Sequence, residues 1–552
     1  MLCISVLLVA IDNTIVNVAL PTLNRRINAS TADLQWIVTA YSLLFAGLLL
    51  VAGHLGDRMG RKRILQIGLV LFALTSLAAA RSTSVDQLIA ARAGMGVAAA
   101  LIYPSTLALL SSTFTDRKQK AAAIGIWSGV SGLAVGLGPL AGGLLLEHYW
   151  WGSIFMVNIP VVAVALIAGF RLVPESRDPA PGRFDLAGAL LSVALISLLV
   201  WAVIEAPVRG WTDVTTVLAF AGVIVLLATF IFWESRRQNP LLDVSFFRNP
   251  RFSAAAAAIS MAFFGLFGFI FVITLYFQLI RGYSTLHAGA ATLPFALVMG
   301  GLSPVAILIM KKIGTKLVVT AGLLLMSAGF IVAARAPLEA SYWRIIVVAM
   351  VLMAAGLALS TGPATDAILG SLPAAKVGVG SAVNDTTREV GGVLGVAITG
   401  SVLSWYYGNR LGTAWGALGV PHAAVQIGKG SVGAGLAIAQ KVPPAQASAV
   451  AAAVKNSFMA GMHAGSFTVA AVTFAGAIAA WLFLPGRDLV PAAGPRVADE
   501  DTGTGRIERR QPGRPGCAFG RPAQDVRGGT GRGACPGRGE CGLGADRCCS
   551  VG

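Results

Sequence analysis

Long apolar stretches follow one another along this chain from its first residue to about residue 485. An α-helix rises about 1.5 Å per residue, so about 20 apolar residues cross the ~30 Å hydrocarbon core of a bilayer. Stretches of this length lie near residues 1–20, 34–53, 64–80, 87–111, 120–146, 152–173, 186–205, 214–233, 253–278, 287–310, 316–335, 343–362, 377–403 and 462–485. The sequence therefore predicts an all-α, polytopic membrane protein with fourteen transmembrane helices.

The composition is that of a membrane protein. Hydrophobic residues make up 56% of the chain, charged residues only 12%, and the mean hydropathy is +0.74. Charged residues alone reach about a quarter of a soluble domain. The first stretch has no basic region before it, carries Asp12 and is followed by Pro21 instead of a small-residue cleavage site. We therefore expect it to be the first transmembrane helix and not a removable signal peptide.

Basic residues gather in alternate loops, as expected when they remain on the cytoplasmic side of a membrane. They are Arg58, Arg61, Lys62, Arg63, Arg117, Lys118, Lys120, Arg171, Arg177, Arg183, Arg236, Arg237, Arg248, Arg251, Lys311, Lys312 and Lys316. Arg25 and Arg26 depart from this pattern. We expect a multi-pass protein of the plasma membrane with both termini in the cytoplasm. The net charge of +17 then reflects topology. The expected partner is the lipid bilayer and not a nucleic acid.

A charged loop punctuated by glycines separates the second and third stretches. It reads Gly53-His54-Leu55-Gly56-Asp57-Arg58-Met59-Gly60-Arg61-Lys62-Arg63. This loop resembles the one between helices 2 and 3 of major facilitator superfamily transporters. We expect Asp57 to accept hydrogen bonds from a neighbouring helix N-terminus, and Arg61 and Lys62 to pair across the bundle. Such contacts would form a latch between two rocking halves; the alternative is a loop that only sets topology. The candidates for the latch are Gly53, Asp57, Arg58, Gly60, Arg61 and Lys62.

The resemblance implies a major facilitator fold of two six-helix bundles, and the two surplus helices are placed as an inserted pair between them. The predicted parts are an N-terminal bundle over 1–173, a linker with the inserted pair over 174–251, a C-terminal bundle over 252–486 and a tail over 487–552. Within the second bundle, 404–461 is predicted to be a long outer loop in which Pro443 and Pro444 begin a short surface helix.

The tail differs in composition from the rest of the chain. It has no apolar period and contains eleven arginines without a lysine, which predicts disorder. Five of the six cysteines lie in it, but it has no Cys-x-x-Cys pair and no histidine partner. We therefore expect no metal site there.

Helix 1 carries a carboxyl group near the middle of the bilayer. Asp12 lies about 11 residues, or roughly 17 Å, from the start of the helix. Charges in this position are costly and by default functional, and a carboxyl group can bind a proton there. The run Ile11-Asp12-Asn13-Thr14-Ile15-Val16-Asn17-Val18-Ala19-Leu20-Pro21 resembles the helix 1 motif of the fourteen-helix drug:proton antiporter family. The resemblance implies a role in proton coupling. The alternative is a structural carboxylate hydrogen-bonded to Asn13 or Asn17.

Arg92 is a second embedded charge. It begins the run Arg92-Ala93-Gly94-Met95-Gly96-Val97-Ala98-Ala99-Ala100, which resembles the helix 4 motif of the same family, although that family usually has Gln at the position of Met95. A guanidinium does not deprotonate in proteins, so Arg92 can only modulate a neighbouring carboxylate or bind an anion. We expect a role in proton coupling; the alternative is an arginine that snorkels from the helix end.

Helix 5 is rich in glycine. Its residues Gly125, Ala134, Gly138, Pro139, Gly142 and Gly143 resemble the antiporter motif, with Ala134 in place of one glycine. Glycines at this spacing allow helices to approach closely, and Pro139 removes a backbone donor and kinks the helix. The resemblance implies a helix that bends during alternating access and seals against leaks. The alternative is a tightly packed, kinked helix without a mechanistic role.

Helix 13 carries a charged cluster. Asp385 and Glu389 are four residues apart and share a helix face, and Arg388 can pair with Asp385. The cluster is similar to the corresponding helix of members of the same family. It is a possible second site for a proton or a cation, or a structural cluster whose charges neutralise one another.

The resemblance covers about residues 1–485 and implies a proton-coupled exporter of drugs, that is, of amphipathic or cationic small molecules, which works by alternating access. Asp12 would bind a proton from outside, and its release inward would be coupled to outward passage of the substrate. The candidate cavity residues, which are equally able to face lipid, are Phe263, Phe264, Phe267, Tyr276 and Phe277.

Three other functions are open. A dedicated exporter of one endogenous metabolite or antibiotic would use the same coupling residues. A passive channel is disfavoured by the embedded Asp12 and Arg92. A membrane enzyme would need a nucleophile, a metal cluster or a phosphate loop, and the sequence has no such motif. We expect no enzyme, no cofactor and no metal, and an ion gradient as the energy source. The substrate and the oligomeric state cannot be read.

Overall fold

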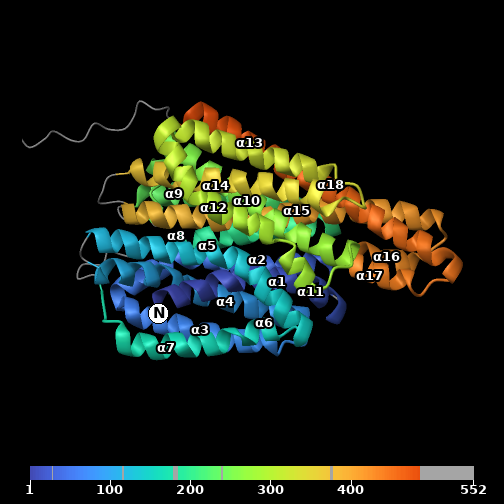
Figure 1. Ribbon diagram of the computed structural model, residues 1–552, viewed down its shortest axis with the longest axis horizontal. Helices are drawn as coiled ribbons and strands as arrows, with labels where there is room; N and C mark the ends of the chain where they lie inside the picture. Colours follow the sequence, from blue (N-terminus) through green and yellow to red (C-terminus); the bar gives the residue numbers. More distant parts are fainter. Residues whose placement is uncertain are drawn as a thin grey trace, which may run out of the picture. The chain divides into compact units, whose positions relative to one another are not determined.

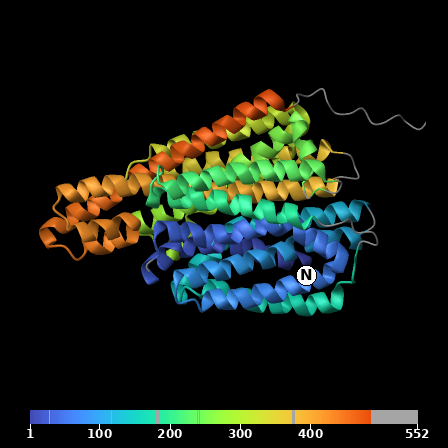
Figure 2. The same ribbon diagram turned by 180° about the vertical axis from the view of Figure 1, so that it is seen from behind.

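The computed structural model describes residues 1–27, 29–114, 117–177, 185–237, 240, 242–372 and 377–484, and these residues contain helices but no strand (Figures 1 and 2). The side chains of several residues between 111 and 135 also lie outside the description. The predicted tail over 487–552, with its five cysteines, falls outside the described residues.

The first group of helices ends at Leu172. It consists of α1 (Leu2–Arg26), α2 (Thr31–Met59), α3 (Arg61–Ala80), α4 (Val85–Thr113), α5 (Arg117–His148), α6 (Ser153–Met156) and α7 (Asn158–Leu172). Within the group, α4 packs on α2 and α3, and α5 packs on α1. The contact between α4 and α2 is close because a Cβ on Gly96 would overlap the carbonyl oxygen of Tyr41. Ser30 and Asp33 form a capping box that begins α2.

The next two helices along the chain are α8 (Leu186–Arg209) and α9 (Val214–Arg236). The Asp185 carboxylate accepts hydrogen bonds from the Gly188 amide at 3.0 Å and from Trp233 Nε1 at 2.9 Å, which fixes the start of α8 to α9. Helix α8 packs on α2 and on α15. Large apolar side chains of α9, such as Leu218 and Ile224, are exposed, as expected for a surface in contact with lipid.

The second group begins after a short 3₁₀ helix, η1 (Val244–Arg248). It consists of α10 (Pro250–Leu275), η2 (Tyr276–Ile280), α11 (Thr285–Ala290), α12 (Leu293–Ile313), α13 (Thr315–Ala334), η3 (Tyr342–Ile346), α14 (Val347–Gly370), α15 (Val377–Ala417), α16 (His422–Gly430), α17 (Val432–Ala439) and α18 (Pro444–Phe483). The segments η2 and η3 are π-helical turns that continue α10 and precede α14.

Thirteen helices among the described residues are long and apolar enough to cross a membrane. Helix α5 covers the remaining predicted span, near 120–146, so each of the predicted spans has a helix in the structure.

The segment 404–461 is not the long loop that the sequence predicts. Helix α15 continues to Ala417, α16 and α17 follow, and α18 begins at Pro444, so the predicted short surface helix is the start of a 40-residue helix. Figures 1 and 2 show these orange segments beyond the end of the neighbouring helices. A 40-residue helix is about 60 Å long, twice the thickness of a hydrocarbon core. A scan for apolar stretches detects only the lipid-facing parts of α15 and α18. The polar continuations of these helices were therefore wrongly predicted as a loop.

Hydrogen bonds between the two groups gather at the end of the bundle where α16 and α17 lie. Gln35 Nε2 of α2 donates to the Ala397 carbonyl of α15 at 2.8 Å, and Gln278 Nε2 of η2 donates to the Val18 carbonyl of α1 at 2.8 Å. At the same end, Asn24 Nδ2 of α1 donates to Ser431 Oγ at 2.7 Å. The two groups are therefore joined by polar contacts at this end.

Candidate functional site

The two embedded charges of the first group form an ion pair. Arg92 Nη1 of α4 lies 2.5 Å from Asp12 Oδ2 of α1, and both side chains are 0% exposed. Two charges this deeply buried are tolerated only when they are paired and hydrogen-bonded. Arg92 lies two turns inside α4, which begins at Val85, so it is not an arginine that snorkels from the helix end.

Neighbouring helices complete the hydrogen bonds of this pair. Asn158 Nδ2 at the start of α7 donates to Asp12 Oδ1 at 3.1 Å and lies 3.2 Å from Ser76 Oγ of α3. Arg92 Nε donates to the Ile37 carbonyl at 3.1 Å. The guanidinium carbon lies 4.3 Å from the centroid of the Tyr41 ring, a cation–π contact. Of the guanidinium nitrogens, Nη2 is buried without a hydrogen-bond partner among the described residues.

The pairing could not be read from the sequence because Asp12 and Arg92 are 80 positions apart. Asn158, Ser76 and Tyr41 were missed altogether. One signal for Asn158 was present, since a polar amide stands alone in the apolar run Phe155-Met156-Val157-Asn158-Ile159. Asn17, one of the alternative partners predicted for Asp12, bonds elsewhere. Its Nδ2 donates to the Asn13 carbonyl of the same helix at 3.2 Å.

The charged segment 53–63 is not the predicted loop, because α2 continues to Met59 and α3 begins at Arg61, which leaves only Gly60 between them. Its ion pair lies within the segment, and its hydrogen bonds reach α7 and the residues that follow α7. Arg61 Nη2 lies 2.7 Å from Asp57 Oδ1 one turn earlier, instead of the helix N-terminus expected for Asp57. The Arg61 amide donates to the Ser176 carbonyl at 2.8 Å. The predicted partners across the bundle are thus replaced by the segment that follows α7. Of the other latch candidates, Arg58 is exposed and Gly53 makes ordinary van der Waals contact with Pro104.

Glu175 and Lys62 strengthen the same contact. The Lys62 amide donates to Glu175 Oε1 at 3.0 Å, and Lys62 Nζ donates to the Phe170 carbonyl at 3.2 Å. Gly60 has a φ of 111°, and a Cβ there would lie 2.7 Å from Glu175 Oε1. A side chain at Gly60 would therefore be strained and would displace the carboxylate.

The glycines of α5 lie against two helices from different groups. A Cβ on Gly138 would overlap the Thr14 hydroxyl of α1, and one on Gly142 would lie 2.8 Å from Ile15 Cγ1 of the same helix. One on Gly143 would lie 2.7 Å from the Thr285 carbonyl oxygen of α11. Pro139 lies inside α5, and its carbonyl contacts Gly289 of α11. These glycines therefore bring α1, α5 and α11 into backbone contact. The surroundings of Gly125 lie outside the described side chains.

The charged cluster of α15 does not form the predicted Asp385–Arg388 pair, which is absent from the ion pairs of the described residues. Arg388 Nη2 donates to Thr365 Oγ1 of α14 at 3.1 Å, and Asp385 Oδ1 accepts from Asn384 Nδ2 at 3.2 Å. The Arg388 guanidinium carbon also lies 5.2 Å from the centroid of the Phe263 ring of α10, so the Arg388 side chain contacts both α14 and α10.

Glu389 faces the first group of helices. Its carboxyl group lies near the Ser42 hydroxyl of α2, and Ser42 Oγ donates its hydrogen bond to Asn13 Oδ1 at 3.4 Å. Asn13 follows Asp12 in α1, so polar side chains connect Glu389 with the neighbourhood of the buried pair. Arg388 Nε and Glu389 Oε2 are buried and have no hydrogen-bond partner among the described residues.

Comparison with known proteins identifies the family. A sequence model described as "Major Facilitator Superfamily" matches residues 2–396. The chain belongs to this superfamily. It is therefore a multi-pass membrane transporter and not an enzyme. Solved structures show the same fold. The chain superposes with a TM-score of 0.58 and 17% identity on an inward-facing bacterial homologue of the lysosomal transporter Spinster, covering 87% of this chain and 96% of that one.

Three curated relatives are named as efflux, resistance or export proteins. The chain is 36% identical to the multidrug efflux pump LfrA of Mycolicibacterium smegmatis over 480 residues, which cover 86% of this chain and 94% of LfrA. It is 35% identical to the tetracenomycin C resistance and export protein of Streptomyces glaucescens, covering 87% and 90% of the two chains. It is 32% identical to the methyl viologen resistance protein SmvA of Salmonella typhimurium, covering 82% and 90%.

Proposed function

We propose that this protein exports amphipathic or cationic drug-like molecules in exchange for protons. The buried Asp12–Arg92 pair is the observation that supports coupling to protons. A carboxyl group can carry a proton or a negative charge, whereas the guanidinium remains positive. A proton on Asp12 cancels the attraction to Arg92 and alters the hydrogen bond from Asn158, so protonation and the packing of α1, α4 and α7 are linked. The names of LfrA and SmvA support the substrate class.

We propose that the two groups of helices rock about the space between them. The contacts at the α16–α17 end, including the Gln35 and Gln278 hydrogen bonds, would break when that end opens. The glycines at 138, 142 and 143 would allow α5 to change its contacts with α1 and α11. At the opposite end of the bundle, Asp57, Arg61 and Lys62 would stabilise one conformation through their ion pair and through hydrogen bonds to the segment that follows α7.

The basic loops support a topology with both termini in the cytoplasm and the α16–α17 end outside the cell. We assign the N-terminal bundle to 1–173, the linker and inserted pair to 174–251 and the C-terminal bundle to 252–486. The inserted pair α8–α9 would then extend the lipid-facing surface, as its exposed apolar side chains indicate. The cluster of Asp385, Arg388 and Glu389 is a candidate second site for a proton or a cation.

A second candidate function is export of one antibiotic. The similarity to the tetracenomycin C resistance and export protein favours it, since that protein is named for one compound. The coupling residues would be the same, so transport assays with a panel of compounds separate a broad from a narrow exporter.

Proton coupling is tested in everted membrane vesicles that contain the full chain. Internal pH is followed while ethidium and methyl viologen are added, and Asp12→Asn is compared with Asp86→Asn, an exposed carboxyl group near the start of α4. We expect substrate-induced proton release from the unaltered chain and from Asp86→Asn, and none from Asp12→Asn. Unchanged proton release in correctly inserted Asp12→Asn would refute the coupling role.

A further inference from the structure

Arg92 of α4 has three partners, and only one of them can lose its charge. Its Nη1 pairs with the Asp12 carboxylate of α1. Its Nε donates to the Ile37 carbonyl of α2 at 3.1 Å, and its guanidinium carbon lies 4.3 Å from the centroid of the Tyr41 ring on the same helix. When a proton neutralises Asp12, the two partners on α2 remain.

Tyr41 is fixed by contacts with two other helices. Its side chain is 0% exposed, and its hydroxyl donates to the Val9 carbonyl of α1 at 3.2 Å. Its own carbonyl oxygen lies against Gly96 of α4, where a Cβ would overlap it. The close contact between α2 and α4 therefore keeps the ring beside the guanidinium of Arg92.

The Tyr41 ring interacts in opposite ways with the two members of the ion pair. The face of an aromatic ring is negative, so it attracts the guanidinium and repels a carboxylate. The attraction is stronger when both groups are removed from water, as they are here. When Asp12 carries a proton, the repulsion disappears and the attraction to Arg92 remains. The ring therefore stabilises the protonated form of Asp12 relative to the ionised form.

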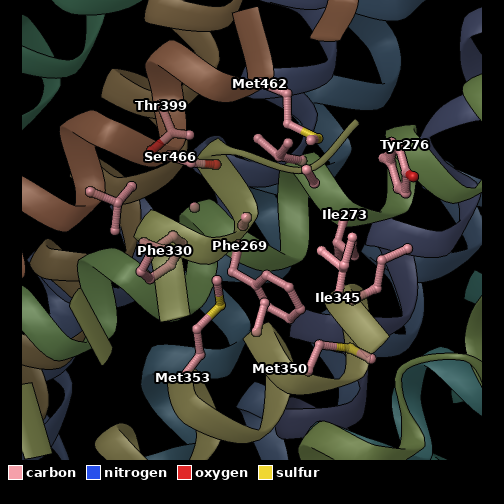
Figure 3. A pocket seen from close by; sticks show the side chains of 17 residues that line it. Phe269, Ile273, Tyr276, Phe330, Ile345, Met350, Met353, Thr399, Met462 and Ser466 are labelled. Carbon is pink, nitrogen blue, oxygen red and sulfur yellow. The ribbon is translucent and has the colours of Figure 1, made fainter. Parts of the chain in front are cut away.

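Few other charges lie near this pair. Asp12 accepts hydrogen bonds from Arg92 and from the uncharged amide of Asn158. From the second group of helices, Glu389 of α15 interacts electrostatically with Tyr41. The apolar space inside the second group, shown in Figure 3, has no acidic or basic side chain among the residues that line it. A buried cation without a partner is very costly, so the groups on α2 must hold Arg92 when Asp12 is neutral.

We propose that Tyr41 is a positioning residue for proton coupling, which holds Arg92 in place while a proton occupies Asp12. The role rests on the proposed function, because it requires Asp12 to carry the proton. Arg92 then keeps its contacts with α2 in both states of Asp12, and it is in position to pair with the carboxylate when the proton leaves. Without the ring, a higher proton concentration would be needed to protonate Asp12.

The first test measures denaturant unfolding of the full chain in mixed micelles. Tyr41→Leu is introduced alone and together with Asp12→Asn, which replaces the carboxylate by a neutral group. We expect Tyr41→Leu to raise the unfolding equilibrium constant by a factor at least about three times larger in the Asp12→Asn background. Phe45→Leu is the matched control, because Phe45 lies one turn further along α2, is 4% exposed and packs on Tyr41. Its effect should be the same in both backgrounds.

The second test measures proton release from the purified full chain on addition of ethidium, as a function of pH. Tyr41→Leu should move the midpoint of this profile about 0.5–1 pH unit lower, which is a threefold to tenfold change in proton concentration. Tyr41→Phe keeps the ring beside Arg92 and should leave the midpoint in place. Phe45→Leu should also leave the midpoint in place, even if it lowers the amount of protein that folds.

Equal effects of Tyr41→Leu in the two backgrounds, or equal midpoints for Tyr41→Leu and Phe45→Leu, would overturn the proposal and leave the export function intact. If Tyr41→Leu does not fold, pentafluorophenylalanine is introduced at position 41, because it keeps the shape of the ring but has a positive face. A midpoint equal to that of Tyr41→Phe then overturns the proposal. Absence of ethidium-induced proton release from the unaltered chain would refute the proposed function instead, and the unfolding measurements would still decide the role of Tyr41.

Discussion

The two charged clusters of this transporter differ in how their buried charged side chains are paired and hydrogen-bonded. Asp12 and Arg92 come from two helices and are 0% exposed. Two further helices hydrogen-bond to them, since Asp12 accepts from Asn158 of α7 and Arg92 donates to the Ile37 carbonyl of α2. The α15 cluster lies on one helix, is partly exposed, and leaves buried atoms of Arg388 and Glu389 without partners among the described residues. Arg92 Nη2 of the first cluster is likewise buried without a partner among the described residues, so the difference lies in the pairing of the charges. Asp12 and Arg92 pair directly with each other, whereas no ion pair joins Asp385 and Arg388 among the described residues.

The largest expected effect comes from breaking the first cluster. Arg92→Ala leaves the Asp12 carboxylate buried without its counter-charge and should lower the free energy of unfolding by about 3–5 kcal/mol. Denaturant unfolding in mixed micelles measures this. The double variant Asp12→Asn with Arg92→Ala should recover part of the loss. If the double variant is as unstable as the sum of the single variants, the two residues do not interact.

A smaller loss is expected at the edge of the same cluster. Asn158→Ala removes the donor to Asp12 Oδ1 and should cost about 1–3 kcal/mol. Asn17→Ala is the control, because Asn17 donates within its own helix. The comparison is made by the same unfolding assay. An Asn17→Ala cost equal to that of Asn158→Ala would show that the amide of Asn158 has no particular importance for the pair.

The second cluster should respond in transport and not in stability. Glu389→Gln removes an ionisable group at constant size, and Glu389 Oε2 has no hydrogen-bond partner among the described residues, so the free energy of unfolding should change by less than about 0.5 kcal/mol. Export of the dication methyl viologen should fall about tenfold, or about 1.4 kcal/mol, and export of ethidium less. Asp366→Asn, an exposed carboxyl group on α14, is the control. Equal losses for the two dyes would argue against a cation site.

The smallest expected effect tests whether the two clusters are energetically coupled through Ser42. Ser42→Ala removes the hydroxyl between Asn13 and Glu389 and should lower export about threefold, the value of one net hydrogen bond of roughly 0.6 kcal/mol. In a Glu389→Gln background the same change should have no further effect. Export is measured in vesicles for the unaltered chain, Ser42→Ala, Glu389→Gln and the double variant, which together form a double-mutant cycle. Losses that multiply would show that Ser42 and Glu389 act independently.

The sequence predicted what depends on local patterns. Helix positions followed from apolar length, and Asp12, Arg92 and the glycines of α5 were found because charges and small residues are conspicuous in apolar runs. It did not predict partners far apart in the chain, such as Asn158 for Asp12 or Thr365 for Arg388. It also missed the continuation of α15 and α18 beyond the bilayer, since residues outside lipid need not be apolar. Long-range packing decides these features.

The contact between α17 and α1 also bears on the kinetics of export. Asn24 Nδ2 donates both to Ser431 Oγ and to the Ala29 carbonyl, and Thr31 Oγ1 donates to the Gly430 carbonyl, so a segment of the second group rests on the turn between α1 and α2. In the proposed topology this segment covers the extracellular opening of the transporter. The rate of substrate release would then include the time needed to break these contacts. Shortening 418–443 would speed release of the substrate and allow it to diffuse back.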